Sequence, residues 1–418
     1  FGSSFSSSIQ HRLPEARASR TLHQFGPRAD KAPKKSMGCS SSNAASTSPE
    51  GRRRRLSLGH VDASSAEEAN PNADEEDRGL LTKLNGETAL GLIDGNDRKF
   101  SVGSETDTSK TSFANKTFQF AGDKVDPEAL GIGYTCRKGL KPESPNQDSW
   151  SVFNVDGNFT IYGVYDGHGQ KGHDVSNYVK ENMPKLILRD QRFKTADMPK
   201  MLGDVFKKAQ SLIACADRMM KLSAQMSGTT ATVVVHDHVE KKLTVAHVAD
   251  STCVLGSYTD ESKSSFVGKA LTRDHKPDLK DERARIEKAG GRVVFDGYAN
   301  HRVYAKKGRY PGLNMSRCLG DLIGHADAGC SCEPEVSERN IDPLDHVLLI
   351  CSDGVWEFIT PQEAVDKVGP EAPAQAMPTA EQLAKEAWDR WIREEGGCVV
   401  DDITVLLVYL QSCTKPTP

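Results

Sequence analysis

The chain has 418 residues, enough for one large domain with tails or for two medium domains. Its net charge is -4 at pH 7 and its pI is about 6.3, so no global basic field favours binding to nucleic acid. The 10 cysteines show no CxxC pair or zinc-like spacing, which indicates reduced thiols inside the cell. The longest apolar runs are too short to span a bilayer. We therefore expect a cytoplasmic protein.

The first 110 residues predict a disordered N-terminal tail. They are rich in Ser, Arg, Ala, Asn and acidic residues, and they show no sustained helical or strand period. A linker is expected over residues 111–129, a catalytic domain over 130–411 and a short C-terminal tail over 412–418.

Two short motifs lie within this tail. The stretch MGCSSS matches the myristoylation pattern if translation begins at Met37, with Gly38 as the acceptor and Cys39 as a candidate for palmitoylation. The stretch RRRRLSL places the basic block Arg52–Arg55 beside Ser57, a candidate regulatory phosphorylation site. Acylation together with the basic block would anchor the chain peripherally to the cytoplasmic face of a membrane. Serine-rich tails also contain such strings by chance.

The region after residue 130 alternates strand-like and helix-like segments. Apolar, β-branched runs predict strands within 148–155, 158–166, 230–238, 242–250, 252–258, 345–353 and 402–410. Helical spacing of apolar residues predicts helices over 175–187, 201–213, 279–291 and 380–395. Strands often follow one another directly, so we expect an α+β fold of two packed antiparallel β-sheets flanked by helices.

Aspartates flank four of these strands. Asp166 and Asp353 each end a strand and precede a glycine, whereas Asp148 and Asp401 each stand just before a strand. In antiparallel sheets the end of one strand lies beside the start of its neighbour, so the four carboxylates can converge on one edge. Asp250, at the turn of a hairpin-like segment, can join them.

Clustered carboxylates repel one another and lose hydration, so a fold gathers them where cations fill the gap. Oxygen ligands without clustered Cys or His favour a hard ion, Mg²⁺ or Mn²⁺. A single Asp-Gly pair at a strand end is usually only a turn, because Asp bonds its own backbone and Gly supplies a positive φ. Four strands flanked in the same way favour a site with two divalent ions.

Eight segments occur in the order of the metal-dependent protein phosphatases, the type 2C serine/threonine family. They are NQDSW, VYDGHGQ, SGTTATVVV, VAHVADST, LTRDHKPD, MSRCLGD, LLICSDGVWE and DDITVLLV. The chain resembles this family from about residue 130 to 410. The resemblance implies a β-sandwich with a binuclear Mg²⁺ or Mn²⁺ site, a weaker third ion, and a metal-bridged hydroxide that attacks the phosphorus.

The resemblance also implies roles for the aspartates. Asp166 would bridge the two ions and Gly167 would offer its carbonyl, while Asp353 and Asp401 would complete the second ion's ligands. Asp148 would hold metal-bound water.

Two further roles follow from the same resemblance. Asp250, with Glu357 as a second candidate, falls where the family places the third ion. His168 is the candidate acid that protonates the leaving alkoxide, because imidazole titrates near neutral pH. Its alternative role is only to orient Asp166.

One position departs from the family pattern. Glu143 stands where the family commonly has an arginine that grips the phosphate. Lys141, Lys138 and Arg137 are the basic residues available nearby. A lysine binds phosphate as a point charge, without the two parallel hydrogen bonds of arginine, so looser phosphate binding is expected.

These observations lead us to predict a monomeric protein serine/threonine phosphatase that acts on phosphoproteins. The alternative is a catalytically weak pseudophosphatase that binds phosphoproteins without turnover. Pseudoenzymes typically lose metal carboxylates, whereas Asp148, Asp166, Asp353 and Asp401 are all present. A metal-dependent nuclease is disfavoured because the sequence lacks a basic groove with interleaved aromatic residues.

Overall fold

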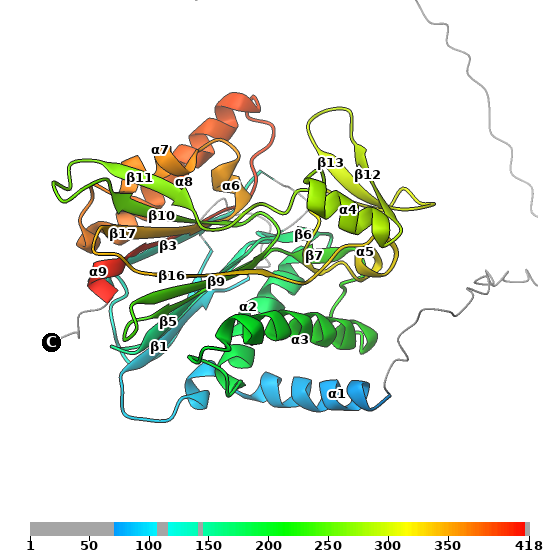
Figure 1. Cartoon of the computed structure of the whole chain (residues 1–418), viewed down its shortest axis with the longest axis horizontal. Coiled ribbons are helices and arrows are strands. Elements are labelled where there is room, and N and C mark those ends of the chain that lie inside the picture. Colours follow the sequence, from blue (N-terminus) through cyan, green and yellow to red (C-terminus); the bar gives the residue numbers. More distant parts are fainter. Residues whose placement is uncertain (1–70, 107–115, 141–144, 414–418) are drawn as a thin grey trace, which may run out of the picture. The chain divides into compact units, whose positions relative to one another are not determined.

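The structure is a computed structural model that describes residues 71–106, 116–140 and 145–413 (Figure 1). These residues form two large antiparallel β-sheets with helices on both outer faces, which confirms the predicted α+β class. The seven-stranded sheet has the order β16 (Glu335–Asn340), β9 (Lys242–Val248), β8 (Ala231–Asp237), β5 (Phe159–Tyr165), β4 (Ser149–Val155), β1 (Lys99–Ser104) and β2 (Phe118–Gly122). The five-stranded sheet has the order β11 (Phe266–Ala270), β10 (Thr252–Tyr258), β17 (Asp345–Cys351), β18 (Ile403–Tyr409) and β3 (Ile132–Arg137).

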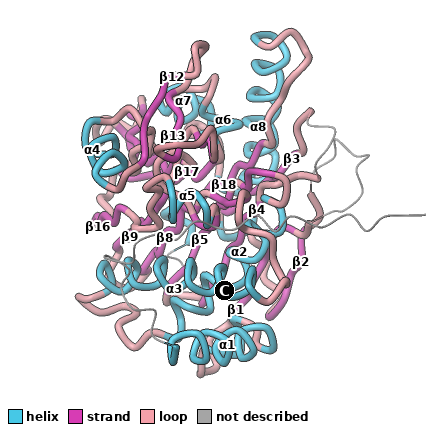
Figure 2. Tube along the Cα trace, turned by 90° about the vertical axis from the view of Figure 1, so that its right-hand side faces the viewer, coloured by secondary structure: helices cyan, strands magenta, loops and turns pink. Residues whose placement is uncertain are grey.

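Helices cover the outer faces of both sheets. The seven-stranded sheet carries α1 (Pro71–Gly86), α2 (Gly172–Arg189) and α3 (Met198–Arg218), and the five-stranded sheet carries α6 (Asp353–Trp356), α7 (Pro361–Val368) and α8 (Ala376–Glu394). Figure 2 shows α1 and α3 on one side of the strands and α7 and α8 on the other. The short elements are η1 (Ala89–Leu92), η2 (Glu128–Leu130), η3 (Pro373–Gln375) and α9 (Leu410–Cys413).

Two small sheets lie beyond the sandwich. One contains β12 (Gly291–Phe295), β13 (His301–Ala305) and β14 (Pro311–Leu313), with α4 (Lys280–Lys288) and α5 (Leu322–Asp327) nearby. The other contains β15 (Leu319–Gly320), β7 (Ser227–Thr229) and β6 (Gly167–Gly169). The second sheet matters for the site, because β6 directly follows Asp166.

Strand alternation divides the apolar residues between separate cores. In β17, Leu348 and Ile350 face the other sheet, whereas Val347 and Leu349 face α7 and α8. Because successive side chains of a strand point to opposite faces, one continuous apolar run fills two layers. The uniform hydrophobicity that predicted these strands therefore arises from burial on both faces.

The expected domain boundary was wrong for part of the chain. Residues 71–104 were assigned to a disordered tail, but they contain α1 and β1, and β1 pairs with β4. Leu81 and Leu84 of α1 are buried against α2 and α3. The surrounding residues of α1 are mostly polar or charged, so this narrow apolar stripe gives a weak periodic signal. The expected linker over 111–129 likewise contains β2, which pairs with β1 in the seven-stranded sheet. Residues 1–70 and 414–418 lie outside the described residues, so their assignment to tails stays a prediction.

Candidate active site

The carboxylate of Asp148 connects the two sheets. Asp148 directly precedes β4 of the seven-stranded sheet and is fully buried. Its Oδ2 accepts a hydrogen bond of 2.7 Å from the Ser352 hydroxyl and another of 2.7 Å from the Thr404 hydroxyl. Ser352 follows β17 and Thr404 lies in β18, so both donors belong to the five-stranded sheet. One side chain therefore joins the ends of three strands at one edge of the sandwich.

Asp166 lies between β5 and β6, and its backbone is fixed on both sides. Its carbonyl accepts from the Thr230 backbone N–H at 2.8 Å and from the Thr229 hydroxyl at 3.0 Å. The Gly167 N–H donates to the Gln147 carbonyl over 3.2 Å. A Cβ on Gly167 would lie 2.6 Å from that carbonyl, so only glycine allows this close approach. The segments that carry Asp148 and Asp166 thus lie side by side.

Asp353 and Asp401 lie in adjacent segments. Asp353 is the first residue of α6, and a Cβ on the following Gly354 would lie 2.0 Å from the Asp402 carbonyl. Asp402 donates its backbone N–H to Asp401 Oδ1 over 2.7 Å. The Asp402 carboxylate in turn accepts from the Gln147 N–H, also over 2.7 Å. All four strand-flanking aspartates therefore belong to segments in direct contact with one another.

Asp402 was missed by the sequence reasoning. It is buried, and its two carboxylate oxygens accept the backbone N–H groups of Gly139 and Gln147, each over 2.7 Å. The sequence pattern indicates its neighbour Asp401 instead, because Asp401 stands just before a predicted strand. The pair itself gives no signal that one carboxylate would bind backbone groups.

The electrostatics of the cluster disfavour a fully ionised state. Burial raises the pKa of Asp148 to about 6, with the Asp402 carboxylate as the next cause. Within the described residues, Asp148 Oδ1 is buried and has no hydrogen-bond partner. A cation with oxygen ligands fits this donor set, because it would offset the repulsion and use the remaining oxygen.

Asp250 has a cation beside it already. Its buried carboxylate pairs with the ammonium of Lys276. Burial lowers the pKa of Lys276, but the carboxylates of Asp250, Asp353 and Asp274 outweigh burial and raise it. A third ion at Asp250 would therefore have to compete with Lys276 for the carboxylate.

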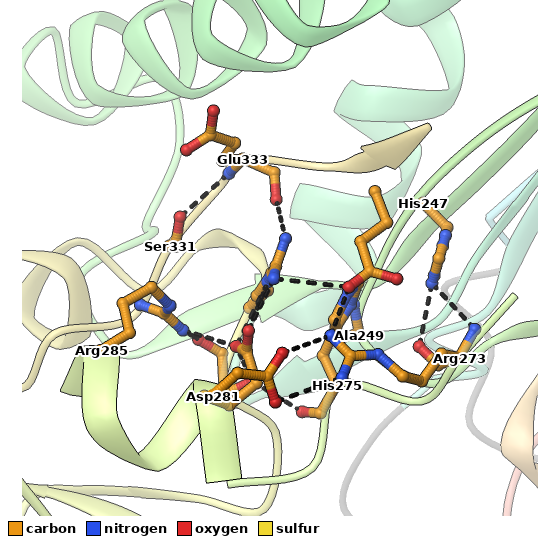
Figure 3. A network of polar contacts seen from close by, with 12 residues as sticks. His247, Ala249, Arg273, His275, Asp281, Arg285, Ser331 and Glu333 are labelled. Atoms are coloured by element: carbon orange, nitrogen blue, oxygen red, sulfur yellow. Dashed lines mark hydrogen bonds and ion pairs between the residues drawn. The ribbon is translucent and has the colours of Figure 1, made fainter. Parts of the chain in front are cut away.

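The segment before Asp250 is held by a buried histidine, as Figure 3 shows for His275 beside Ala249. The Ala249 backbone N–H donates to His275 Nδ1 over 3.0 Å, and the His275 backbone N–H donates to the Ala249 carbonyl over 3.0 Å. Ala249 has a φ of 74°, which is uncommon for a residue with a Cβ. The His275 ring stacks on His247 with centroids 4.6 Å apart, and this packing fixes the turn that presents Asp250.

His168 contacts a buried carboxylate that the sequence reasoning did not identify. Its Nε2 lies 2.5 Å from Asp321 Oδ2, and the side chains are 20% and 1% exposed. Asp321 ends the MSRCLGD motif, has a φ of 42° and follows β15. The motif contributed to the family resemblance, but an acid after Leu-Gly reads as an ordinary turn residue.

The basic residues differ in placement. The guanidinium of Arg137 lies over the Trp388 ring, 4.5 Å from its centroid, and lines a groove with α8. Lys138 is buried and Lys141 lies outside the described residues. Lys116, which sequence reasoning missed, is buried and donates its ammonium to the Asp148 carbonyl. Phosphate binding by Arg137 or Lys141 stays a prediction.

The residues of the tail motifs, Gly38, Cys39 and Ser57, also lie outside the described residues. Among the helices that the structure describes, none is both long and apolar enough to cross a membrane.

Comparisons of the sequence with a family model and with known proteins all match protein phosphatases 2C. The family model described as Protein phosphatase 2C matches residues 143–395. Probable protein phosphatase 2C 48 of Oryza sativa subsp. japonica is 32% identical over 353 residues, which cover 77% of this chain and 98% of that protein. Probable protein phosphatase 2C 73 of Arabidopsis thaliana is 32% identical over 291 residues, covering 64% of this chain and 76% of that protein.

The solved structures show the same fold at lower identity. The serine-threonine phosphatase 2C of Toxoplasma gondii superposes with a TM-score of 0.58 at 18% identity, covering 66% of this chain and 94% of its own. A sex determining protein of C. elegans superposes with a TM-score of 0.55 at 21% identity, covering 68% of this chain and 66% of its own.

Proposed function

Because the chain belongs to the protein phosphatase 2C family of serine/threonine phosphatases, we propose that it hydrolyses phosphoserine and phosphothreonine in proteins at the carboxylate cluster described above. The observation that carries the proposal is the buried Asp148, tied to Ser352 and Thr404 beside the acidic pair Asp401 and Asp402. A cation bound where these carboxylates meet, between the two sheets, would offset their repulsion and stabilise their ionised forms.

The residues present fit two Mg²⁺ or Mn²⁺ ions. Asp166, Asp353 and Asp401 would supply carboxylate oxygens, and Gly167 would supply its carbonyl. Asp148 Oδ1, buried without a hydrogen-bond partner among the described residues, would hold water near the ions. When bound, such ions supply an activated water nucleophile and offset negative charge on the phosphoryl oxygens. A weaker third ion at Asp250 would have to displace Lys276.

The chain's own proton donor is His168. The leaving oxygen of a serine or threonine side chain is strongly basic, so protonation lowers the barrier to its departure. The Asp321 carboxylate, 2.5 Å from His168 Nε2, stabilises the protonated ring and fixes its orientation. This pairing favours the acid role over the alternative in which His168 only orients Asp166.

The test is hydrolysis of a phosphothreonine peptide by the full chain with Mn²⁺, with Mg²⁺ and with chelator. We expect activity that depends on the ion and is lost in Asp166→Asn and Asp353→Asn. Asp389→Asn, an exposed acid on α8, is the matched control and should keep activity. Phosphopeptide binding without turnover at any Mn²⁺ concentration would instead favour the pseudophosphatase alternative.

A further inference from the structure

A second group of possible metal ligands borders the active site. One ring nitrogen of His168, the Cys318 thiol and one Asp321 oxygen all lie within 4.8 Å of one another. Cys318 and Asp321 are buried, while the His168 side chain is 20% exposed. Asp321 Oδ1 is buried without a hydrogen-bond partner at ordinary geometry within the described part of the chain, and the Asp321 carboxylate lies within reach of the Cys318 thiol. The group therefore gathers a thiol, a carboxylate and a partly exposed imidazole.

The chemistry of this group differs from that of the carboxylate cluster. Thiolate, imidazole and carboxylate are the three ligand types of protein zinc sites, usually in a tetrahedral arrangement. Mg²⁺ and Mn²⁺ prefer oxygen ligands, so a thiol does not favour them. A tetrahedral zinc ion binds its ligand atoms at about 2.0 to 2.3 Å, so these atoms lie less than 4.8 Å from one another, as they do here. Only the 2.5 Å contact between His168 and Asp321 would have to lengthen slightly.

A second group, His247, His275 and Glu335, has its possible ligand atoms equally close together, but these atoms are not available to a metal ion. His275 Nδ1 accepts the Ala249 N–H, and burial lowers the pKa of His275, so the neutral ring carries its proton on Nε2. A nitrogen that carries a proton cannot bind a metal ion.

The other two ligands of that group are also engaged. His247 Nε2 lies 2.9 Å from the Arg273 carbonyl, and the guanidinium of Arg273 contacts the Glu335 carboxylate. Arg317 lies 3.6 Å from the same carboxylate. The two arginine side chains already neutralise the Glu335 carboxylate, so we assign this group a structural role.

We propose that Cys318, Asp321 and His168 form a site for a thiophilic divalent cation, Zn²⁺ above all, that inhibits the enzyme. Binding releases the thiol proton of Cys318 and the Nε2 proton of His168 to solvent, a sulfur–metal and a nitrogen–metal bond form in their place, and water fills the fourth position. The ion takes up the His168 nitrogen and the Asp321 oxygens together, so the pair can no longer deliver a proton. Binding stands on the geometry alone, whereas the inhibitory effect rests on the proposed function of His168.

Metal binding is tested without reference to activity. The full chain, stripped with chelator and supplied with excess Mg²⁺, is titrated with Co²⁺ while the near-ultraviolet thiolate-to-cobalt absorption is followed. We expect this absorption in the wild type, its loss on adding Zn²⁺, and its absence in Cys318→Ser. Cys253→Ser, which alters another fully buried cysteine inside the sandwich, should keep it. Absorption that persists in Cys318→Ser, or that never forms in the wild type, overturns the site.

A second variant guards against misfolding of Cys318→Ser. His168→Gln changes a partly exposed ligand, and we expect it to weaken Co²⁺ binding by about 10-fold or more while the thiolate absorption remains attainable. Unchanged Co²⁺ affinity in His168→Gln would contradict the ligand set.

Inhibition is measured on the phosphothreonine peptide with Mg²⁺ in excess. Zn²⁺ should inhibit the wild type and Cys253→Ser alike, and Cys318→Ser should need about 10-fold more Zn²⁺ for half inhibition. Equal Zn²⁺ sensitivity of Cys318→Ser and Cys253→Ser would overturn the inhibitory role. An inactive wild type would contradict the proposed function, but the Co²⁺ absorption would still report on the site.

Discussion

The Asp321 carboxylate gives His168 a fixed direction and a counter-charge. A histidine that acts as an acid must hold its proton until the leaving oxygen departs, and a buried carboxylate at 2.5 Å favours that state. The Asp321 side chain is only 1% exposed and contacts His168, so we regard it as a positioning residue. His168 and Asp321 can be tested separately.

Loss of the His168 imidazole should depend on the leaving group. We expect His168→Gln to slow hydrolysis of a phosphoserine peptide by about 10²-fold, the usual range for general acid catalysis. An aryl phosphate should be affected far less, because a phenolate departs without protonation. Single-turnover rates on both substrates measure the difference, and equal losses would assign His168 a purely structural role.

Asp321→Asn should act through the protonation of His168. Without the carboxylate the protonated ring is less stable, so the basic limb of the pH–rate profile should move to lower pH. The rate on the phosphoserine peptide should fall by about 10 to 100-fold. Asp327→Asn, an exposed acid of α5, is the control. A uniform loss at every pH would contradict the positioning role.

Asp148 should make the metal-free protein less stable as pH rises. Burial raises its pKa from 3.8 to about 6, so the folded state binds its proton more tightly than the unfolded state does. Its contribution to stability is therefore complete below about pH 4 and is lost as pH rises through about 6. In chelator above pH 6, the free energy of unfolding of Asp148→Asn should exceed that of the wild type by roughly 3 kcal/mol, because each pKa unit corresponds to about 1.4 kcal/mol.

Urea denaturation of both proteins in chelator, at one pH below this window and one above it, measures the effect. The difference between variant and wild type should grow with pH and shrink when Mn²⁺ is added. A difference that does not change with pH would show that ionised Asp148 is well tolerated without metal.

At the scale of elements, buried strands were the easiest to predict. In β17, β18 and β8 every residue except His346 is buried, so their apolar runs stand out from the polar sequence around them. Edge strands carry no such signal. All five residues of β2 are exposed, and β16, with the sequence EVSERN, has three charged residues and no buried one. Both lie at the ends of the seven-stranded sheet, where a strand has a neighbour on one side only.

The helix α1 should contribute to stability although it precedes the expected domain. Leu84 is fully buried in the core shared with α2 and α3, so Leu84→Ala leaves a cavity. We expect a loss of about 2 to 5 kcal/mol in the free energy of unfolding. Lys83→Ala in the same helix is exposed and should change stability by less than about 0.5 kcal/mol. Equal effects in urea denaturation would mean that α1 does not pack as described.

On the scale of the whole molecule, the sequence predicted which segments meet at the candidate site but not how they contact one another. The aspartates at strand ends could be found because strand ends are visible as changes in hydrophobicity. Ser352, Thr404 and Asp402 could not, since their roles depend on contacts between segments more than 200 residues apart. Asp321 and Lys276 belong to motifs of the family resemblance, but the sequence did not predict a role for either residue.

The N-terminal motifs make a separate prediction about the whole chain. If translation begins at Met37, a myristate analogue should label the protein through Gly38, and Gly38→Ala should move it from membranes to the soluble fraction. Labelling requires Gly38 to follow the initiator directly, so mass spectrometry of the native N-terminus is the check. An unmodified terminus upstream of Met37, with membrane binding unchanged in Gly38→Ala, would contradict acylation.

The hydrogen bonds from Ser352 and Thr404 to Asp148 have a consequence for cooperativity. They join the start of β4 in one sheet to β17 and β18 in the other. The two sheets therefore cannot separate at this edge without disrupting the candidate active site. Enzymes whose sites sit on mobile loops often lose activity before they unfold. Here inactivation and global unfolding should share one denaturant midpoint, and amide hydrogens at Ser352 and Thr404 should exchange only when the whole domain opens.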